Sequence, residues 1–241
     1  MPKGSLIAVG LGIRADDQIT PEARAAILDA DVVLYAIGDR FSAASLLRLR
    51  PDAEDLATLY GHGRPRSDTY SLMTQAMVDP VLDGRMVCYA AYGHPGVFAG
   101  SAGAAIDRLR EAGYDAKMLP GISADACLLA DLQVNLFNGL QSYEATEFLR
   151  VVPAIESRAS LLIWGIGVAG NPGWPFQPDL KSIELLETFL TDIYGPDHEA
   201  VIYQAATYSL LEPTIHRTTV GAIGQCEHPV LSTLYVPSST D

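Results

Sequence analysis

Arg66 and Tyr70 lie four residues apart at the start of a segment that is typical of a helix. This spacing places both side chains on one face of a helix. A guanidinium beside a phenol favours the phenolate, and it also stabilises negative charge that develops in a reaction. Tyr70 is therefore a candidate general base and Arg66 a candidate partner for the developing charge. The alternative is an arginine stacked on a surface tyrosine, with no role in chemistry.

The first glycine-rich turn follows a short apolar strand near the N-terminus. Residues 10–15 read Gly-Leu-Gly-Ile-Arg-Ala and match the G-x-G-x-x-A pattern of dinucleotide-binding turns. In those sites the helix begins inside the turn, so that its N-terminus faces the diphosphate. Here the strongest helix start is Thr20, followed by Pro21, and Asp16 and Asp17 would repel a diphosphate. The pattern favours a loop that lines a cleft without binding phosphate; a dinucleotide site and a purely structural turn remain alternatives.

A second glycine-rich loop, residues 92–98, follows the strand predicted over residues 86–91. Ligands bind at the carboxyl ends of strands in open parallel sheets, and glycine lets a ligand approach the backbone closely. The loop also carries two aromatic side chains, Tyr92 and Phe98, which a simple connection from strand to helix does not need. We therefore interpret this loop as part of a binding site.

Apolar runs alternate with helix-like segments through the first half of the chain, which predicts a parallel sheet. The segments of that half are strands over 6–9, 32–35, 86–91 and 116–119 and helices over 20–29, 68–78 and 101–112. The second half is less regular. Its segments are helices over 123–132 and 182–194 and strands over 161–164, 200–205 and 230–236. The prediction is an α/β protein with two open-sheet domains, residues 1–119 and 120–241.

The composition excludes several classes of protein. The chain of 241 residues carries 16 Lys and Arg against 29 Asp and Glu, and a net charge of −13 opposes binding to a nucleic-acid backbone. Apolar residues make up 49% of the chain, which favours a globular protein over a disordered one. Neither the three cysteines nor the histidines have the spacing of a disulfide framework or a metal site. We therefore expect no metal. No signal peptide or membrane span is recognisable, so we expect a cytoplasmic protein.

Three motifs follow one another along the chain. They are the strand with its G-x-G turn, the Gly-x-Pro-Gly loop at residues 93–96, and Pro-Gly-Ile-Ser-Ala at residues 120–124. Their order resembles that of the tetrapyrrole methylase superfamily, over nearly the whole chain. This resemblance implies a class III methyltransferase that holds S-adenosylmethionine in a cleft between two domains. Corrin- and haem-pathway members usually read Gly-Asp-Pro where this chain has Gly93-His94-Pro95, which disfavours a tetrapyrrole substrate.

Further segments narrow the resemblance. Residues 66–70 (Arg-Ser-Asp-Thr-Tyr), 92–98 and 142–145 (Ser-Tyr-Glu-Ala) are similar to those of the borosin α-N-methyltransferases. Those enzymes methylate backbone amide nitrogens of a ribosomally made precursor peptide, which in many of them is fused at the C-terminus. Because this sequence ends at Asp241, soon after its last predicted strand, we expect the split type. That type acts on a separate precursor with a leader and a hydrophobic core.

The resemblance also implies roles for individual residues. Arg66 and Tyr70 match the catalytic pair, and Tyr60 and Tyr92 match supporting tyrosines that could hold the peptide carbonyl by hydrogen bonds. The positions that match cofactor contacts are, in chain order, Tyr92, His94, Val97, Phe98, Ser123, Ala124, Ala205, Ser232 and Thr233. Aromatic and oxygen-rich walls suit a positively charged sulfonium. Gly165 departs from the family pattern, which has a polar cofactor contact at that position.

Class III methyltransferases are usually homodimers, so the resemblance implies a homodimer that binds precursor peptide, with a 2:2 assembly as one form. Two other functions stay open. One is methylation of a tetrapyrrole, a corrinoid or another small molecule by an enzyme of the same superfamily. The other is a non-catalytic peptide-binding protein that keeps the fold. Binding of S-adenosylmethionine without turnover on any peptide would favour the last.

Overall fold

The computed structural model describes residues 4–97, 100–171, 173, 177 and 179–239. The chain forms two compact units. The first comprises Met1–Cys127 and Ala206–Glu212, and the second comprises Leu128–Ala205 and Pro213–Asp241. The sequence prediction divides the chain between residues 119 and 120. In the structure the units change after Cys127, and a short segment from the second half belongs to the first unit.

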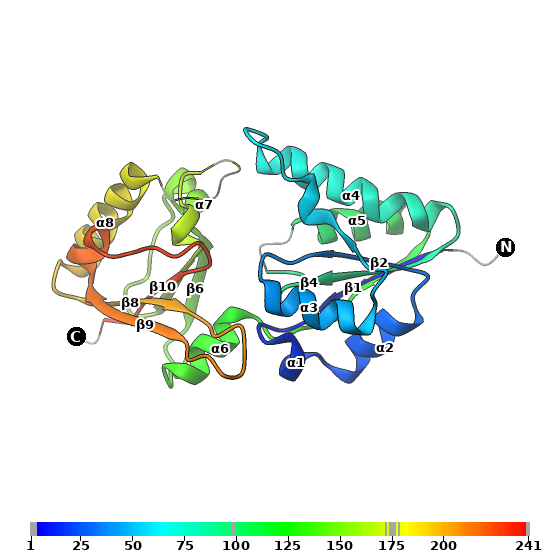
Figure 1. Ribbon diagram of the computed structural model, residues 1–241. Helices are drawn as coiled ribbons and strands as arrows, with labels where there is room; N and C mark the ends of the chain where they lie inside the picture. Colours follow the sequence, from blue (N-terminus) through cyan, green and yellow to red (C-terminus); the bar gives the residue numbers. More distant parts are fainter. Residues whose placement is uncertain (1–3, 98–99, 172, 174–176, 178, 240–241) are drawn as a thin grey trace. The chain divides into compact units, whose positions relative to one another are not determined.

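The first unit is built on a five-stranded sheet with the strand order β3-β2-β4-β1-β5 (Figure 1). All its strand pairs are parallel. The strands are β1 (Ser5–Gly10), β2 (Val32–Ala36), β3 (Glu54–Asp55), β4 (Met86–Ala91) and β5 (Asp115–Met118). Because the strands run in the same direction, the loops that follow β1, β4 and β5 all leave from the same edge of the sheet.

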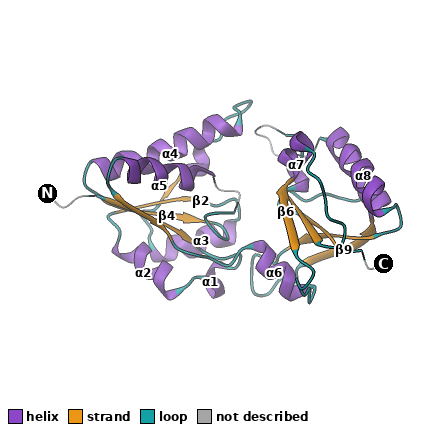
Figure 2. Cartoon of the chain, turned by 180° about the vertical axis from the view of Figure 1, so that it is seen from behind, coloured by secondary structure: helices purple, strands orange, loops and turns teal. Residues whose placement is uncertain are grey.

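Helices cover both faces of this sheet (Figure 2). The helices are α1 (Ala15–Gln18), α2 (Pro21–Asp29), α3 (Arg40–Leu49), η1 (Leu56–Leu59), α4 (Arg66–Leu82) and α5 (Gly100–Glu111). Alternate side chains of β4 point to opposite faces. Tyr89 and Ala91 join the apolar cluster under α4 and α5, whereas Cys88 and Ala90 join the cluster under α1, α2 and α3.

Side-chain caps explain where two of these helices begin. The Thr20 hydroxyl accepts a hydrogen bond from Ala23 N at 3.1 Å, and Pro21 takes the first helical position, so α2 begins where the sequence predicts. The Asp39 carboxylate accepts from Ser42 N at 2.7 Å and starts α3, which the sequence analysis did not predict. The short helix α1 was also not predicted.

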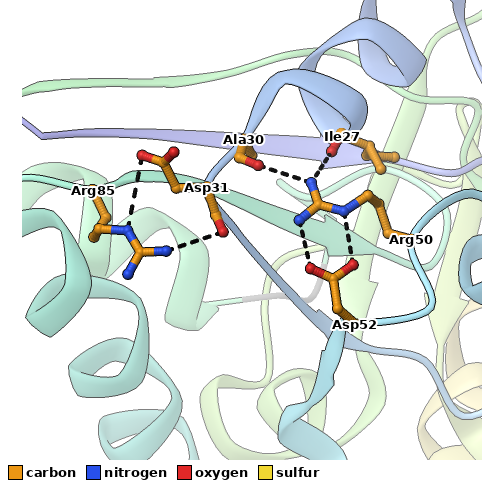
Figure 3. Close-up of polar contacts among 6 residues, drawn as sticks. All are labelled: Ile27, Ala30, Asp31, Arg50, Asp52 and Arg85. Atoms are coloured by element: carbon orange, nitrogen blue, oxygen red, sulfur yellow. Dashed lines mark hydrogen bonds and ion pairs between the residues drawn. The ribbon is translucent and has the colours of Figure 1, made fainter.

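Arg50 closes the end of α2 at the amino edge of the sheet (Figure 3). Its Nη1 donates to the carbonyl oxygens of Ile27 at 2.7 Å and Ala30 at 2.8 Å. Its Nε and Nη2 donate to the two carboxylate oxygens of Asp52 at 2.9 and 2.8 Å. One guanidinium therefore satisfies two helix-end carbonyls and pairs with a carboxylate.

Asp31 and Arg85 immediately precede β2 and β4 and form a second link at this edge (Figure 3). The Asp31 carboxylate accepts from Met86 N at 2.8 Å and lies 3.9 Å from Arg85 Nε. Arg85 Nη2 also donates to the carbonyl oxygen of Asp31 at 3.3 Å. These contacts hold the starts of the two neighbouring strands together.

The second unit contains a mixed five-stranded sheet with the order β6-β7-β10-β8-β9. Only the β6–β7 pair is parallel among these pairings. The strands are β6 (Leu140–Glu144), β7 (Ser160–Trp164), β8 (Glu199–Gln204), β9 (Thr214–Thr219) and β10 (Thr233–Val236). One face packs against α7 (Ala145–Val151), α8 (Leu180–Tyr194), η2 (Ile166–Val168) and η3 (Val220–Gln225).

Helix α6 (Ala124–Asp131) connects the two sheets in sequence. Tyr203 of β8 is completely buried, and its hydroxyl donates to the carboxylate of Asp131 at 2.6 Å, which fixes the end of α6 on the second unit. No helix in the described part of the chain is long and apolar enough to cross a membrane.

Candidate functional site

Three glycines bring the loops after β1, β4 and β5 into direct contact. A Cβ atom on Gly10 would lie 2.2 Å from the carbonyl oxygen of Gly93 and 2.8 Å from the Cα of Gly121. A Cβ on Gly121 would lie 2.5 Å from the same oxygen and 2.7 Å from the Cα of Gly10. Close approach of a ligand was the reason predicted for the glycines of the 92–98 loop. At Gly10 and Gly121 the reason for glycine is that the backbones of the loops touch one another.

The turn at residues 10–15 does not offer its amides to a diphosphate. The side-chain oxygen of Gln18 accepts hydrogen bonds from Ile13 N at 2.8 Å and Arg14 N at 2.9 Å. The helix that follows, α1, has only four residues, and α2 begins later at Pro21. The structure therefore agrees with the interpretation of this turn as a loop that does not bind phosphate.

Two predicted cofactor segments lie together in the first unit. A Cβ on Gly93 would lie 3.8 Å from the Cα of Ser123, so the loop after β4 touches the segment that holds Ser123 and Ala124. In this loop Gly96 N donates to Nδ1 of His94 at 2.8 Å, and Val97 N donates to the carbonyl oxygen of His94 at 3.0 Å. In the neutral imidazole the remaining proton is then on Nε2. Phe98, also predicted to contact the cofactor, lies outside the described residues.

Tyr92 belongs to the side of the sheet that faces α1, α2 and α3. Burial is the main cause that raises its pKa, and the nearby Asp39 and Cys127 add to the effect. Tyr92 therefore keeps its proton at neutral pH. Tyr92 was predicted to act with Tyr60 and Tyr70, but those two tyrosines pack against the apolar cluster on the opposite face.

Arg66, Tyr70 and Tyr60 lie close together, as the sequence analysis expected. Arg66 is the first residue of α4 and Tyr70 follows one turn later, while Tyr60 comes directly after η1. Burial is the main cause that raises the pKa of Tyr60; its hydrogen bond to Tyr70 adds to it, and the charge of Arg66 acts in the opposite direction. Because its pKa is raised, Tyr60 keeps its proton at neutral pH and lies beside Tyr70 as a phenol able to donate a hydrogen bond.

The position of Arg66 is electrostatically unusual. The first turn of a helix carries partial positive charge from its free N–H groups, so a cation at that position is unfavourable by a few tenths of a kcal/mol or more. Arg66 and Tyr70 are both half-buried. A cation placed against the helix dipole and next to two phenols is suited to stabilise an anion at this place.

Tyr89 is a fourth polar member of this neighbourhood, and the sequence analysis missed it. It lies in the middle of β4 with 3% of its surface exposed, in the cluster against which Tyr60 and Tyr70 pack. Its hydroxyl forms a hydrogen bond with Ser101 at the start of α5. A tyrosine in an otherwise apolar buried strand needs a partner for its hydroxyl, and that requirement is the signal that could have identified it.

The remaining predicted cofactor residues lie at one edge of the second unit's sheet. Thr233 is the first residue of β10 and pairs with residues at the ends of β7 and β8. Gly165 and Ala205 directly follow those two strands. Ser232 N and Oγ both donate to the carbonyl oxygen of Pro229, at 2.9 and 2.6 Å. This turn explains why β10 begins at Thr233 and not at the predicted residue 230.

The residues of the first unit fit a cationic cofactor better than a phosphate-bearing one. The carboxylate of Asp39 lies near Tyr92, and the Ser123 hydroxyl donates to the carboxylate of Asp125. Carboxylates and an aromatic ring favour a sulfonium and repel a diphosphate. In the described ranges, no three His, Cys, Asp or Glu side chains gather as a metal site would require.

The chain thus combines a parallel α/β unit with a mixed-sheet unit, and predicted cofactor residues lie at a sheet edge of each. The family model of the tetrapyrrole (corrin/porphyrin) methylases matches residues 5–224. The chain therefore belongs to the tetrapyrrole methylase family, whose members are methyltransferases that use S-adenosylmethionine.

Solved structures confirm the predicted fold class. Uroporphyrin-III-C-methyltransferase from Thermus thermophilus aligns with a TM-score of 0.71 at 17% identity, covering 98% of this chain and 93% of that chain. Cobalt precorrin-4 methyltransferase, a cobalamin biosynthetic enzyme, aligns with a TM-score of 0.66 at 18% identity, covering 97% and 94%. At these identities the likeness concerns the fold alone.

Curated relatives are more similar in sequence. The methyltransferase/ribosomally synthesized cyclic peptide dendrothelin A precursor of Dendrothele bispora is 35% identical over 97% of this chain. The methyltransferase/ribosomally synthesized type I borosin cyclic peptide precursor of Coprinopsis marcescibilis is also 35% identical over 97% of this chain. This chain spans 58% and 62% of the lengths of these two relatives.

Proposed function

We propose that this protein transfers methyl groups from S-adenosylmethionine to backbone amide nitrogens of a peptide. The observation that carries the proposal is the cluster of Arg66, Tyr60 and Tyr70 in a methylase fold. Identity of 35% to proteins whose names join a methyltransferase to a ribosomally synthesized peptide precursor supports a peptide as the substrate.

An amide nitrogen is a poor nucleophile because its lone pair is delocalised into the carbonyl group. Methylation requires removal of the N–H proton and stabilisation of the negative charge that moves onto the carbonyl oxygen. A free tyrosine has a pKa of about 10, far below that of an amide, so a base alone is insufficient. Electrostatic stabilisation must accompany proton removal.

The described residues supply both requirements. Tyr70 takes the amide proton, and the protonated Tyr60 beside it offers a hydrogen-bond donor to the reacting oxygens. Arg66 contributes a positive charge and paired N–H donors for the carbonyl oxygen of the substrate. The cofactor, when bound, supplies an activated methyl group on a sulfonium. Tyr92, His94, Val97, Ser123 and Ala124 would contribute to holding it in the first unit.

We further propose that the peptide is a separate precursor with a leader and a hydrophobic core, and that the enzyme is a homodimer. Both follow the family resemblance. In the curated relatives the methyltransferase and the precursor are one protein by name, so an experiment must distinguish methylation of the enzyme's own chain from methylation of an added peptide. Light scattering at micromolar concentration tests the dimer, and a monomer mass would contradict it.

Cofactor binding is tested first. S-adenosylhomocysteine should bind in a calorimetric titration and raise the midpoint of thermal unfolding, because a ligand that binds only the folded state stabilises it. NAD should do neither. Absence of S-adenosylhomocysteine binding would contradict the proposed activity.

Methyl transfer is tested by mass spectrometry. The enzyme is expressed alone and together with each small open reading frame found beside its gene that encodes a hydrophobic C-terminal segment. We expect the second protein to gain mass in steps of one methyl group, and fragmentation to place each methyl on a backbone nitrogen. Methylation of a corrinoid or porphyrinogen with no methylated peptide would favour the small-molecule alternative. Cofactor binding without transfer to any peptide would favour a non-catalytic peptide-binding protein.

A further inference from the structure

We propose that a small cavity between α1, α2 and α3 is a docking site for the leader of the precursor peptide. It takes an acidic side chain together with a large apolar side chain one helical turn away. The inference rests on the proposed function, because it names a place where the enzyme holds its peptide substrate. None of the residues predicted to bind the cofactor or to act in catalysis lines this cavity.

The cavity lies within the first unit and has a volume of about 260 Å³. Figure 1 shows α1, α2 and α3 together on the side of the sheet opposite α4 and α5. Pockets for drug-sized ligands and cofactors have volumes of about 300–1,000 Å³, so this cavity suits one or two side chains. Its apolar lining consists of the buried Leu11, Ala15 and Leu46 and the half-buried Ile19 and Leu49.

The rim of the cavity carries an excess of positive charge. Arg24 of α2, Arg48 of α3 and Asp16 of α1 all contribute to it. Arg48 Nη2 donates to the carboxylate of Asp16 and, at 3.0 Å, to Oγ of Ser45, so Arg48 and Asp16 neutralise each other. Arg24 is exposed and has no ion pair or side-chain hydrogen bond with any described residue. The guanidinium of Arg24 is therefore available to an anion from outside the chain.

The charges favour a carboxylate as that anion. The whole chain has a net charge of −13, so a rim with excess positive charge is complementary to an acidic partner where most of the chain is not. A carboxylate pairs with the two parallel N–H donors of a guanidinium. A phosphate would bring a second negative charge close to Asp16, at a cost that a carboxylate avoids.

A peptide makes better use of this cavity than a free acid does. The cavity encloses few atoms, which limits the affinity of a molecule confined to it, whereas a peptide adds contacts outside. On a helix, side chains three or four residues apart have Cβ atoms about 5–6 Å apart. An acidic residue and a leucine or phenylalanine at that spacing can reach Arg24 and the apolar lining together.

The first test compares Arg24→Glu with Lys181→Glu. The substrate is the small protein that gains methyl groups on co-expression. Arg24→Glu should raise KM for this protein by about 10-fold, because an attractive contact at an exposed rim becomes repulsive. The turnover number kcat and the affinity for S-adenosylhomocysteine should stay within about twofold of wild type. Lys181 is exposed on α8 of the second unit, so Lys181→Glu makes the same change in net charge and should keep the wild-type KM.

A charge exchange identifies the occupant. Each acidic residue of the leader is changed to lysine in turn, and one of these changes should raise KM with wild-type enzyme and restore it with Arg24→Glu. Ile19→Gln, in the apolar lining, should also raise KM severalfold at an unchanged midpoint of thermal unfolding. 3-Phenylpropionate, a free acid of the same chemistry, is titrated in parallel.

Four results would overturn or reject the leader as occupant. A wild-type KM in both Arg24→Glu and Ile19→Gln would overturn the docking site and leave the proposed function intact. A raised KM that no leader substitution restores would do the same for the leader. Binding of 3-phenylpropionate that depends on Arg24, with no change in KM, would assign the cavity to a small acid. Absence of peptide methylation by the wild type would reject both the proposed function and the docking site.

Discussion

The two edges of the parallel sheet in the first unit use polar groups differently. At the amino edge, Arg50 pairs with Asp52, Arg85 pairs with Asp31, and backbone groups next to the strands are satisfied by these side chains (Figure 3). At the carboxyl edge, glycine backbones touch one another, and the cation Arg66 occupies a helix N-terminus beside the half-buried phenols of Tyr60 and Tyr70.

The polar groups of the amino edge contribute mainly to stability, and those of the carboxyl edge are suited to chemistry. Arg50, Asp52, Asp31 and Arg85 each have a partner of opposite sign at the amino edge, so these four groups lower the free energy of the folded state. The carboxyl edge contains arrangements that cost stability, namely a cation against a helix dipole and phenols kept away from water. Such costs are typical of sites retained for function. Substitutions at the two edges should therefore have different consequences.

Arg66→Lys should have the largest effect on methylation. A lysine keeps the charge but cannot reproduce the planar pair of N–H donors, so the rate should fall by at least ~100-fold, the scale of losing one donor to a developing anion. Affinity for S-adenosylhomocysteine should stay within about twofold of wild type. Arg64→Lys, two residues earlier and exposed, is the matched control and should keep the wild-type rate. Equal methylation rates in wild type, Arg66→Lys and Arg64→Lys would show that Arg66 takes no part in methyl transfer.

Gly10→Ala should damage the fold at the carboxyl edge. Its Cβ would lie 2.2 Å from the backbone oxygen of Gly93, so the loops must separate at a cost of about 1–3 kcal/mol. S-adenosylhomocysteine binding should weaken as well, because the loop after β4 moves. Gly103→Ala in α5, where a Cβ meets no atom within 4 Å, should be neutral or slightly stabilising. Urea unfolding of both variants checks this, and equal stabilities would show that the loop contact is not tight.

Arg50→Met should reduce stability and leave chemistry unchanged. It removes hydrogen bonds to two carbonyl oxygens and to Asp52, at a cost of about 2 kcal/mol in the free energy of unfolding. At a temperature where the variant is folded, its methylation rate per enzyme should match that of wild type. A large loss of rate with normal stability would contradict the separation of the two edges.

Asp52→Asn should have the smallest effect, and that effect should depend on pH. The Arg50 guanidinium lowers the pKa of Asp52 to about 2, mainly through their hydrogen bond. A carboxyl with a lowered pKa contributes stability above its unfolded value of about 3.9 and loses it as pH falls through the folded value. Wild type should therefore be slightly more stable than Asp52→Asn at pH 7, and the difference should disappear as pH falls toward 2. A difference that stayed constant with pH would reject the ion pair as its cause.

Local signals in the sequence predicted the elements that such signals control. Helix α2 and strand β4 have the predicted bounds, because a threonine cap followed by proline starts the helix and a continuous apolar run forms the strand. The edge strands β6 and β9 were missed. Their residues are mostly polar and partly exposed, so their stability comes from pairing with β7 and β8, which a local pattern does not reveal.

In the candidate site, too, local spacing predicted some features and only the fold revealed the others. The spacing of Arg66 and Tyr70 was enough to predict that they share a helix face. The contact among Gly10, Gly93 and Gly121 joins loops from distant parts of the chain, and only the strand order brings them together. Tyr89 was missed because a tyrosine in an apolar strand has the appearance of core, and its hydroxyl partner Ser101 lies on another element.

The most direct test of the account is the initial rate of peptide methylation by Tyr70→Phe, with S-adenosylhomocysteine affinity measured in parallel. The substitution removes only the hydroxyl oxygen and keeps the ring in the cluster under α4. We predict a rate at least ~100-fold below wild type, the usual scale of losing a general base, with cofactor affinity and thermal stability close to wild type. A wild-type rate would show that Tyr70 only packs and that the amide proton leaves by another route.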